Sequence, residues 1–71
     1  MKAQLLIKTA FGIKLRALRI RHKQTQEQVA CDIGLTQSTY SRIEAGSVEP
    51  GLLTLYRIKE LFGVSWGKLL P

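Results

Sequence analysis

Cysteine and histidine are almost absent from this sequence, and their scarcity excludes several kinds of site. Cys31 is the single cysteine and His22 the single histidine among 71 residues. A lone thiol cannot close an internal disulfide, and one thiol with one imidazole falls short of the four ligands of a structural zinc site. We therefore expect a reduced, cytoplasmic setting, with no metal and no other cofactor.

Long apolar runs and recognisable catalytic groups are missing as well. No segment approaches the roughly 18 consecutive apolar residues that span a membrane, and no leader with a small-residue cleavage site opens the chain. Neither Ser38 nor Ser41 has a histidine near it in the sequence, so no nucleophile, base and orienting group stand together. We expect neither an enzyme, nor a membrane protein, nor a protein with a small-molecule substrate.

Acidic residues are absent from the first third of the chain. Residues 1–23 contain seven lysines and arginines and no acid, whereas residues 24–71 contain four basic and five acidic side chains. The net charge of +6 therefore arises entirely at the N-terminal end. A one-sided basic surface attracts polyanions, so nucleic acid and an anionic membrane surface are the partner classes that it favours.

The hydropathy pattern predicts helices and no strands. Apolar residues recur at spacings of three and four, with glycine or a hydroxyl residue between the segments. The length suits one all-α domain, residues 1–71, with a modest core, and residues 1–7 form a candidate N-terminal extension. Five helices are expected. The first three are residues 8–22, a short helix that starts at Gln26, and residues 36–45. The fourth has Pro50 in its first turn and an apolar face of Leu52, Leu55, Ile58, Leu61 and Phe62, and the fifth is a last turn capped by Ser65.

Two of these helices are very short and almost touch, in the stretch TQEQVACDIGLTQSTYSRIEAG. Thr25 and Gln28 have the spacing of a capping box. Gly34 suits a turn with positive φ, and Thr36 can cap the second helix. Helices of two or three turns are unstable alone, so these two must pack on each other. The pattern is that of a helix-turn-helix (motif 25–45), whose second helix enters the major groove of DNA.

The motifs FGIKLRALR, TQEQVA, GLTQSTYSRIEAG and EPGLLTLYRIKELFGVS extend this pattern over most of the chain. Together they resemble the Cro/repressor-type (XRE-like) helix-turn-helix family of phage and bacterial transcription regulators. The resemblance implies a compact five-helix, lambda-repressor-like DNA-binding domain. The residues that carry it are Arg19, Gln26, Ala30, Gly34, Ile43, Glu44 and Gly46. The chain departs from the family at Lys23 and Gln24, where a glycine and an apolar residue are common, and at Lys68.

The resemblance also implies a role for each polar residue of the motif. The base-reading positions of the recognition helix, 36–45, are Gln37, Ser38, Ser41 and Arg42. Glutamine suits adenine N6 and N7, and arginine suits guanine O6 and N7. The phosphate contact of the family falls on Gln26. Further candidates for phosphate contact are the amides of Ala45 and Gly46 and the cations Arg16 and Lys23. Thr36 and Thr39 are candidates for contact with either a phosphate or a thymine methyl.

Arg19 and Glu44 have a structural role by the same resemblance. They are expected to form an ion pair that ties the first helix to the end of the recognition helix and turns Arg19 away from DNA. The family's usual dimer surface lies near the last helices, where the candidate dimer contacts are Val64, Trp66, Leu69 and Leu70. Trp66 has the alternative role of completing the core.

A second apolar row in the first helix lies apart from the core stripe of Phe11, Leu15 and Leu18. Its members follow one another at spacings of 4, 3, 4 and 3: Leu6, Ala10, Ile13, Ala17 and Ile20. A helix with two apolar faces usually has two surfaces to cover. The row therefore indicates a second subunit or a partner. Taken alone, this basic segment also fits a membrane-surface helix or an organellar presequence.

The function that follows is a sequence-specific DNA-binding transcriptional regulator of a prokaryote or phage. We expect it to bind double-stranded DNA as a homodimer on a near-palindromic operator, with two recognition helices roughly 34 Å apart. The alternative is an antitoxin or controller component whose main partner is another protein and for which DNA binding is secondary.

Overall fold

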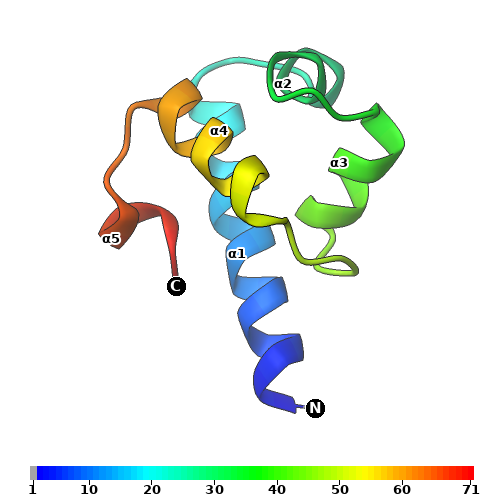
Figure 1. The fold of residues 1–71 in the computed structure, drawn as a ribbon, viewed down its shortest axis with the longest axis vertical. Coiled ribbons are helices and arrows are strands. Elements are labelled where there is room, and N and C mark those ends of the chain that lie inside the picture. The colour runs from blue at the N-terminus through cyan, green and yellow to red at the C-terminus, as the bar shows by residue number, and fades with distance from the viewer. Residues whose placement is uncertain (1) are drawn as a thin grey trace.

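The computed structural model describes residues 2–71, with side chains from residue 6 onward, and within that range it consists of helices and turns (Figure 1). The order is α1 (Lys2–Arg21), α2 (Gln26–Asp32), α3 (Gln37–Glu44), α4 (Leu52–Phe62) and α5 (Trp66–Leu69). No strand occurs in residues 2–71. The prediction of an all-α fold with five helices is confirmed.

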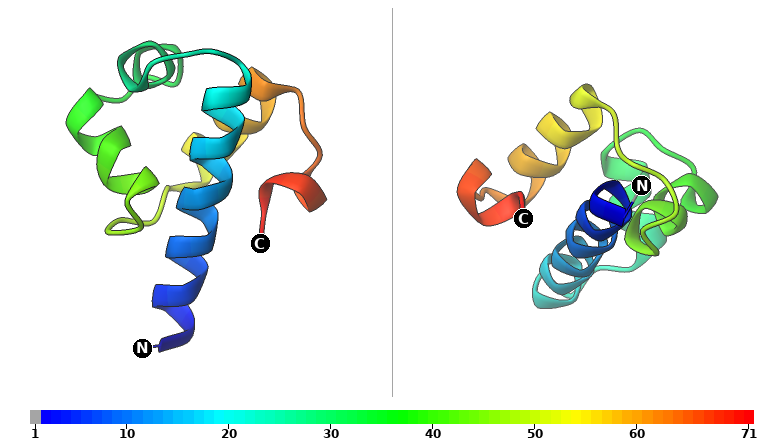
Figure 2. Two further views of the ribbon diagram at one scale, coloured as in Figure 1. Left: turned by 180° about the vertical axis from the view of Figure 1, so that it is seen from behind. Right: turned by 90° about the horizontal axis from the view of Figure 1, so that it is seen from below.

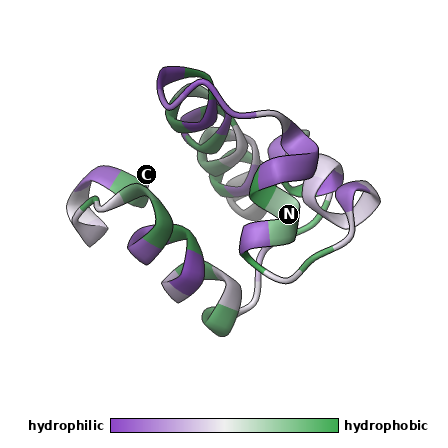
Figure 3. Ribbon diagram, turned by 90° about the horizontal axis from the view of Figure 1, so that it is seen from above, coloured by the Kyte–Doolittle hydropathy of each residue, from purple (hydrophilic) through white to green (hydrophobic). Residues whose placement is uncertain are grey.

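The core forms around α1, which has α3 on one side and α5 on the other (Figures 1 and 2). α2 packs on α3, as two helices too short to be stable alone must. Purple and green alternate along the helices, as expected when each buries one face (Figure 3). The buried apolar residues come from all five helices and the turn after α2: Phe11, Leu15, Val29, Ala30, Ile33, Tyr40, Ile43, Ile58, Phe62 and Leu69.

The end of α2 is closed by hydrogen bonds that depend on Gly34. The amide of Gly34 donates to the carbonyl of Cys31 at 3.2 Å, and the amide of Leu35 donates to the carbonyl of Ala30 at 2.8 Å. This arrangement needs a residue with positive φ, and Gly34 has φ 74°. The chain can therefore leave α2 and enter α3 within a few residues.

Lys23 occupies the same position at the end of α1, without being a glycine. Its amide donates to the carbonyl of Ile20 at 2.9 Å, and the amide of Gln24 donates to Arg19 at 3.1 Å. Lys23 has φ 56°, a conformation that is uncommon for residues with a side chain. The departure from the family pattern at Lys23 and Gln24 thus leaves the turn geometry intact.

Gly12 allows a close crossing of α1 and α3. A Cβ atom on Gly12 would lie 2.3 Å from the carbonyl oxygen of Glu44 and 2.8 Å from that of Ile43. Both neighbours are backbone atoms at the end of α3, so neither can rotate away. The absence of a side chain at Gly12 therefore lets the end of α3, which carries Glu44, approach α1 closely.

Three predicted features of the helices are wrong. α1 begins at Lys2, not at residue 8, so the candidate extension 1–7 continues the helix over its described part. Pro50 lies before α4 and not in its first turn, because Gly51 is the N-cap and the helix starts at Leu52. Leu52 was expected on the apolar face but is 73% exposed, since it stands in the first turn of α4, beyond the helix face that packs on the core.

Candidate nucleic-acid interface

The outer face of α3 is polar, and its inner face is apolar. Gln37, Ser38 and Arg42 are exposed, and Ser41 is partly buried at the edge of the same face. Tyr40 and Ile43 are buried beneath them and hold α3 against the core. The four predicted base-reading residues thus share one side of a helix that a small core keeps in place.

The first turn of α3 is capped by Thr36. Its hydroxyl oxygen accepts a hydrogen bond from the amide of Thr39 at 3.2 Å and donates its proton to the hydroxyl of Thr39 at 3.0 Å. The proton of the Thr39 hydroxyl remains available to an acceptor outside the chain. Of the two threonines, Thr39 therefore has the free donor, although its side chain is partly buried.

Arg19 and Glu44 form a bidentate ion pair between α1 and the end of α3. The Nε of Arg19 donates to Oε2 of Glu44 at 2.6 Å, and its Nη2 donates to Oε1 at 3.2 Å. Its Nη1 donates to the backbone oxygen of Gln24 at 3.0 Å, at the turn that leads into α2. The side chains are only 13% and 4% exposed. One guanidinium therefore links α1, the entry to α2 and the end of α3.

Gln26 belongs to the same cluster. Its Nε2 donates to Oε1 of Glu44 at 3.2 Å, and the side chain is partly buried at the start of α2. This contact orients the amide of Gln26 and occupies one of its two N–H groups, which leaves the second proton and the amide oxygen for another partner. The sequence holds no signal for this pairing, because 18 positions separate the two residues.

The ion pair shifts the pKa values of its members. Burial by itself raises the pKa of the Glu44 carboxyl, but the hydrogen bonds from Arg19 and Gln26 outweigh it and hold the pKa below its ordinary value. The hydrogen bond with Glu44 raises the pKa of Arg19. Burial raises the pKa of the neighbouring Tyr40. The cluster therefore holds one anion and one cation at neutral pH, and Tyr40 stays neutral.

The lowered pKa of Glu44 predicts a loss of stability in acid. Because the folded pKa is depressed, its contribution is complete above the ordinary value of 4.5 and is lost as the pH falls through the folded pKa. We expect Glu44→Gln to be less stable than the native chain at about pH 7, with a difference that narrows below about pH 4. Urea unfolding over a series of pH values measures this difference. A difference in stability between the two proteins that stays constant with pH would contradict the prediction.

The predicted phosphate contacts at Ala45 and Gly46 are wrong. The amide of Ala45 donates to the carbonyl of Ser41 at 3.0 Å, and the amide of Gly46 donates to the carbonyl of Ile43 at 3.1 Å. Gly46, with φ 80°, lets the amide of Ser47 donate to the carbonyl of Arg42 at 3.0 Å and so closes the end of α3, with the amides of Ala45 and Gly46 already engaged inside it. Neither amide is left for an external anion.

The two predicted cations near the motif are exposed on the α1 side of the molecule. Arg16 lies on α1, and Lys23 lies in the turn that joins α1 to α2. Both are three or four residues from Arg19, whose own charge is neutralised by Glu44. They therefore provide free positive charge beside the cluster, which Arg19 does not.

The predicted dimer contacts are mostly buried within the chain, so that prediction is wrong for Leu69. Leu69 is 0% exposed, because it closes the core against α1. Val64 and Trp66 are partly buried against the core, and the ring of Trp66 makes an edge contact with Tyr56 at 5.2 Å between centroids. Leu70 is 40% exposed. Of the four residues, Leu70 alone is exposed.

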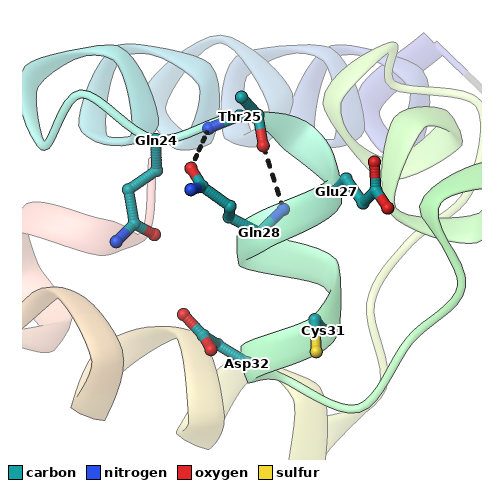
Figure 4. Close-up of a pocket in the computed structure, with 6 residues that line it drawn as sticks. All are labelled: Gln24, Thr25, Glu27, Gln28, Cys31 and Asp32. Atoms are coloured by element: carbon teal, nitrogen blue, oxygen red, sulfur yellow. Dashed lines mark hydrogen bonds between the residues drawn. The ribbon is translucent and has the colours of Figure 1, made fainter.

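A shallow hollow on the outer side of α2 has the wrong charge for nucleic acid. It is lined by Gln24, Thr25, Glu27, Gln28, Cys31 and Asp32, and Figure 4 shows the capping-box hydrogen bonds of Thr25 and Gln28 along it. Its two carboxylates repel phosphate. Cys31, on the same side of α2, is exposed.

Other classes of site find no support in the described residues. Within residues 2–71, no three histidine, cysteine or acidic side chains gather as metal ligands would. None of the helices described there combines the length and hydropathy that crossing a bilayer requires. The α3 face and its supporting cluster are therefore the candidate site.

Two residues that position the site were missed by sequence reasoning. Gly12 sets the distance between α1 and α3, and its only signal is a glycine inside an apolar helical pattern. Arg57 on α4 donates from Nη1 to the carbonyl of Ile33 at 3.3 Å, close to the turn at Gly34. No spacing rule in the sequence connects Arg57 to that turn.

Comparison with known proteins finds similarity over most of the chain. A family model described as helix-turn-helix matches residues 15–69. The SPbeta prophage-derived uncharacterized HTH-type transcriptional regulator YonR of Bacillus subtilis is 35% identical over 60 residues, which cover 84% of this chain and 56% of YonR. The cryptic phage CTXphi transcriptional repressor RstR of Vibrio cholerae is also 35% identical over 60 residues, or 84% of this chain and 54% of RstR.

A third relative is more nearly the same size. An uncharacterized HTH-type transcriptional regulator of Methanocaldococcus jannaschii is 37% identical over 51 residues, which cover 72% of this chain and 77% of that protein. By contrast, this chain spans about half the length of YonR and RstR.

Proposed function

Because this chain belongs to the helix-turn-helix family, we propose that it is a sequence-specific DNA-binding transcriptional regulator that reads the major groove with α3. The observation that carries the proposal is the exposed polar face of α3 on a buried apolar base. The amide of Gln37 offers the donor and acceptor that an adenine edge requires, and the guanidinium of Arg42 offers the two donors that a guanine edge requires. Ser38 and Ser41 can donate or accept, so they add contact with little discrimination.

The phosphate contacts that we propose come from three elements. Gln26 at the start of α2 has one amide proton free, and the Glu44 hydrogen bond holds its side chain in place. Thr39 has a free hydroxyl proton at the start of α3. Arg16 and Lys23 add charge from the α1 side. Contacts of this kind position the protein on DNA and make its affinity depend on salt.

A homodimer on a near-palindromic operator is part of the proposal. Two recognition helices roughly 34 Å apart would read half-sites one DNA turn apart. Selection of bound fragments from a random duplex pool tests both parts at once. Enrichment of one motif with half-sites about 10 base pairs apart supports them. Binding without enrichment, lost as salt rises, would mean that only the basic surface acts.

The operator recovered in this way allows the α3 residues to be tested one by one. Gln37→Ala and Arg42→Ala should each cost about 1–3 kcal/mol in binding and relax the preference at one base pair. Gln26→Ala should weaken binding to all sites by a similar factor. Affinities for the operator and for each single-base variant measure this, with urea unfolding as the control for folding. If Arg42→Ala lowered affinity equally for every sequence, Arg42 would be a phosphate contact instead.

A further inference from the structure

The outer side of α1 carries an apolar row that the fold leaves uncovered. Leu6 is 69% exposed, Ile13 65% and Ile20 51%, and Ala17 between them is exposed as well. Seen from behind, α1 lies in front of the other helices, and its first turns extend beyond them (Figure 2, left). The core is built from the opposite side of α1, so the row contributes nothing to it.

The spacing of the row is that of a coiled-coil seam. Leu6, Ala10, Ile13, Ala17 and Ile20 alternate at 4 and 3, which places the large residues at d and the alanines at a. A strict a/d row is narrow, whereas a helix that lies in a membrane surface has a broad apolar face. The row therefore fits a second helix better than it fits a bilayer.

A hollow at the centre of the row supports this reading. It has a volume of about 420 Å³ and is lined by Ile13, Arg16, Ala17, Ile20 and Arg21. The first four are the d, g, a and d residues that surround one inserted side chain in knobs-into-holes packing. The small side chain of Ala17 forms the floor on which such a side chain would rest.

Both flanks are basic in the C-terminal half of the seam. Within α1 the e positions are Ile7, Lys14 and Arg21, and the g positions are Thr9 and Arg16. Lys23 lies beyond them, in the turn that follows α1. Lys14 donates from Nζ to the backbone oxygen of Leu70 at 2.9 Å, so its charge is kept on the α5 side, whereas Arg16 and Arg21 are exposed. Residues 1–23 hold no acid that could neutralise them.

These charges decide between a second copy of the chain and a different partner. In a parallel pair the g residue of one helix faces an e residue of the other, and in an antiparallel pair g faces g and e faces e. In the half of the seam that carries Lys14, Arg16 and Arg21, either pairing of two α1 helices sets arginine or lysine against arginine or lysine. Charge on the flanks thus opposes self-pairing and favours a helix with acids at the same positions.

We propose that the outer row of α1 docks an amphipathic helix of another protein, with apolar residues at a and d and glutamate or aspartate at e and g. This surface is distinct from the α3 face, and it shares only Arg16 with the proposed phosphate contacts. The apolar row itself does not depend on the proposed reading of DNA.

A pair of synthetic helices tests the proposal on the intact 71-residue chain. Each is about three heptads long with leucine at a and d; one carries glutamate at e and g, and the other lysine. The acidic peptide is expected to bind at least about tenfold more tightly than the basic one in fluorescence anisotropy titrations. Equal binding of the two peptides, or binding of neither, would overturn the proposal.

Variants identify the surface. Ile13→Ser should lower the affinity for the acidic peptide about ten- to a hundredfold, because it removes a seam residue that does not support the core. Leu53→Ser, at an equally exposed leucine on α4 (62%), should leave the affinity unchanged. Arg21→Glu should lower the affinity for the acidic peptide and raise the affinity for the basic one. Equal losses for Ile13→Ser and Leu53→Ser would place binding elsewhere and refute the proposal.

Two further measurements address the competing occupants. If sedimentation finds a dimer that Ile13→Ser abolishes, a second copy covers the row and the proposal is wrong. The proposal is also wrong if the chain does not bind the acidic peptide but binds vesicles of equal parts phosphatidylcholine and phosphatidylserine, and Ile13→Ser abolishes the vesicle binding. The proposal is supported if the outer row mediates no dimer and if only the seam variants lose peptide binding.

Discussion

Glu44→Ala is expected to lower the free energy of unfolding by about 3–5 kcal/mol, the largest effect of any polar substitution in this chain. The change leaves the guanidinium of Arg19 in a site where its side chain is 13% exposed, without the carboxylate that neutralises it. It also removes the acceptor for Gln26. Urea unfolding measures the loss, which is a large share of the stability available to a domain of this size.

The same variant separates a structural role of the pair from a role in reading DNA. If the pair only orients α3, Glu44→Ala should weaken binding to an operator and to its single-base variants by the same factor. A fully stable variant with altered sequence preference would refute this role. Glu49→Ala, at an exposed acid before α4, is the matched control and should change stability by less than about 0.5 kcal/mol.

Replacing both partners should cost less than replacing one. Arg19→Met combined with Glu44→Leu removes the buried charges together, so no unpaired ion remains. We expect this double variant to be more stable than Glu44→Ala. If the double variant lost more unfolding free energy than the two single variants lose in sum, the contribution of the pair would not lie in mutual neutralisation.

Gly12→Ala is the second substitution with a large expected effect, a loss of about 3 kcal/mol in the free energy of unfolding. The added Cβ would lie 2.3 Å from the carbonyl oxygen of Glu44, and that oxygen belongs to the backbone. The end of α3 must therefore move away from α1, which stretches the hydrogen bonds between Arg19 and Glu44. Alanine's better helix propensity returns only about 1 kcal/mol.

Gly67→Ala is the control for Gly12→Ala. A Cβ at Gly67 would meet nothing closer than Ser65 Oγ at 3.9 Å, which is an ordinary contact. This variant should be as stable as the native chain or slightly more stable. Thermal unfolding of both variants distinguishes a steric effect from a general cost of losing glycine. Equal stabilities for Gly12→Ala and Gly67→Ala would mean that α1 and α3 do not cross as closely as described.

Local chemistry is what made the helices of this chain predictable. Thr25, Thr36 and Ser65 each cap the helix that follows, as the sequence indicates, because a hydroxyl that accepts from an amide three residues on needs no distant partner. The recognition helix and its outward face follow from the same short-range rules. The start of α1 did not, since no capping residue before Lys2 marks a helix start in the sequence.

The packing of the site could not be predicted in the same way. That Gln26 donates to Glu44 and that Arg57 reaches the carbonyl of Ile33 depends on pairs 18 and 24 positions apart. The sequence predicts free donors at Ala45 and Gly46, but both amides are engaged by carbonyls at the end of α3. The sequence predicts a surface contact at Leu69, but the packing of α5 on α1 buries it.

The sequence by itself thus determined the number and order of the helices, the motif at residues 25–45 and the residues on the outer side of α3. Caps, glycine turns and hydropathy periods act within a few residues, so they can be read along the chain. Only the tertiary structure decided which amides are free, how closely α1 and α3 cross at Gly12, and that the row from Leu6 to Ile20 is left uncovered. Those outcomes depend on how the helices approach one another in space, and burial, close contact and charge neutralisation between distant residues exist only once they have packed.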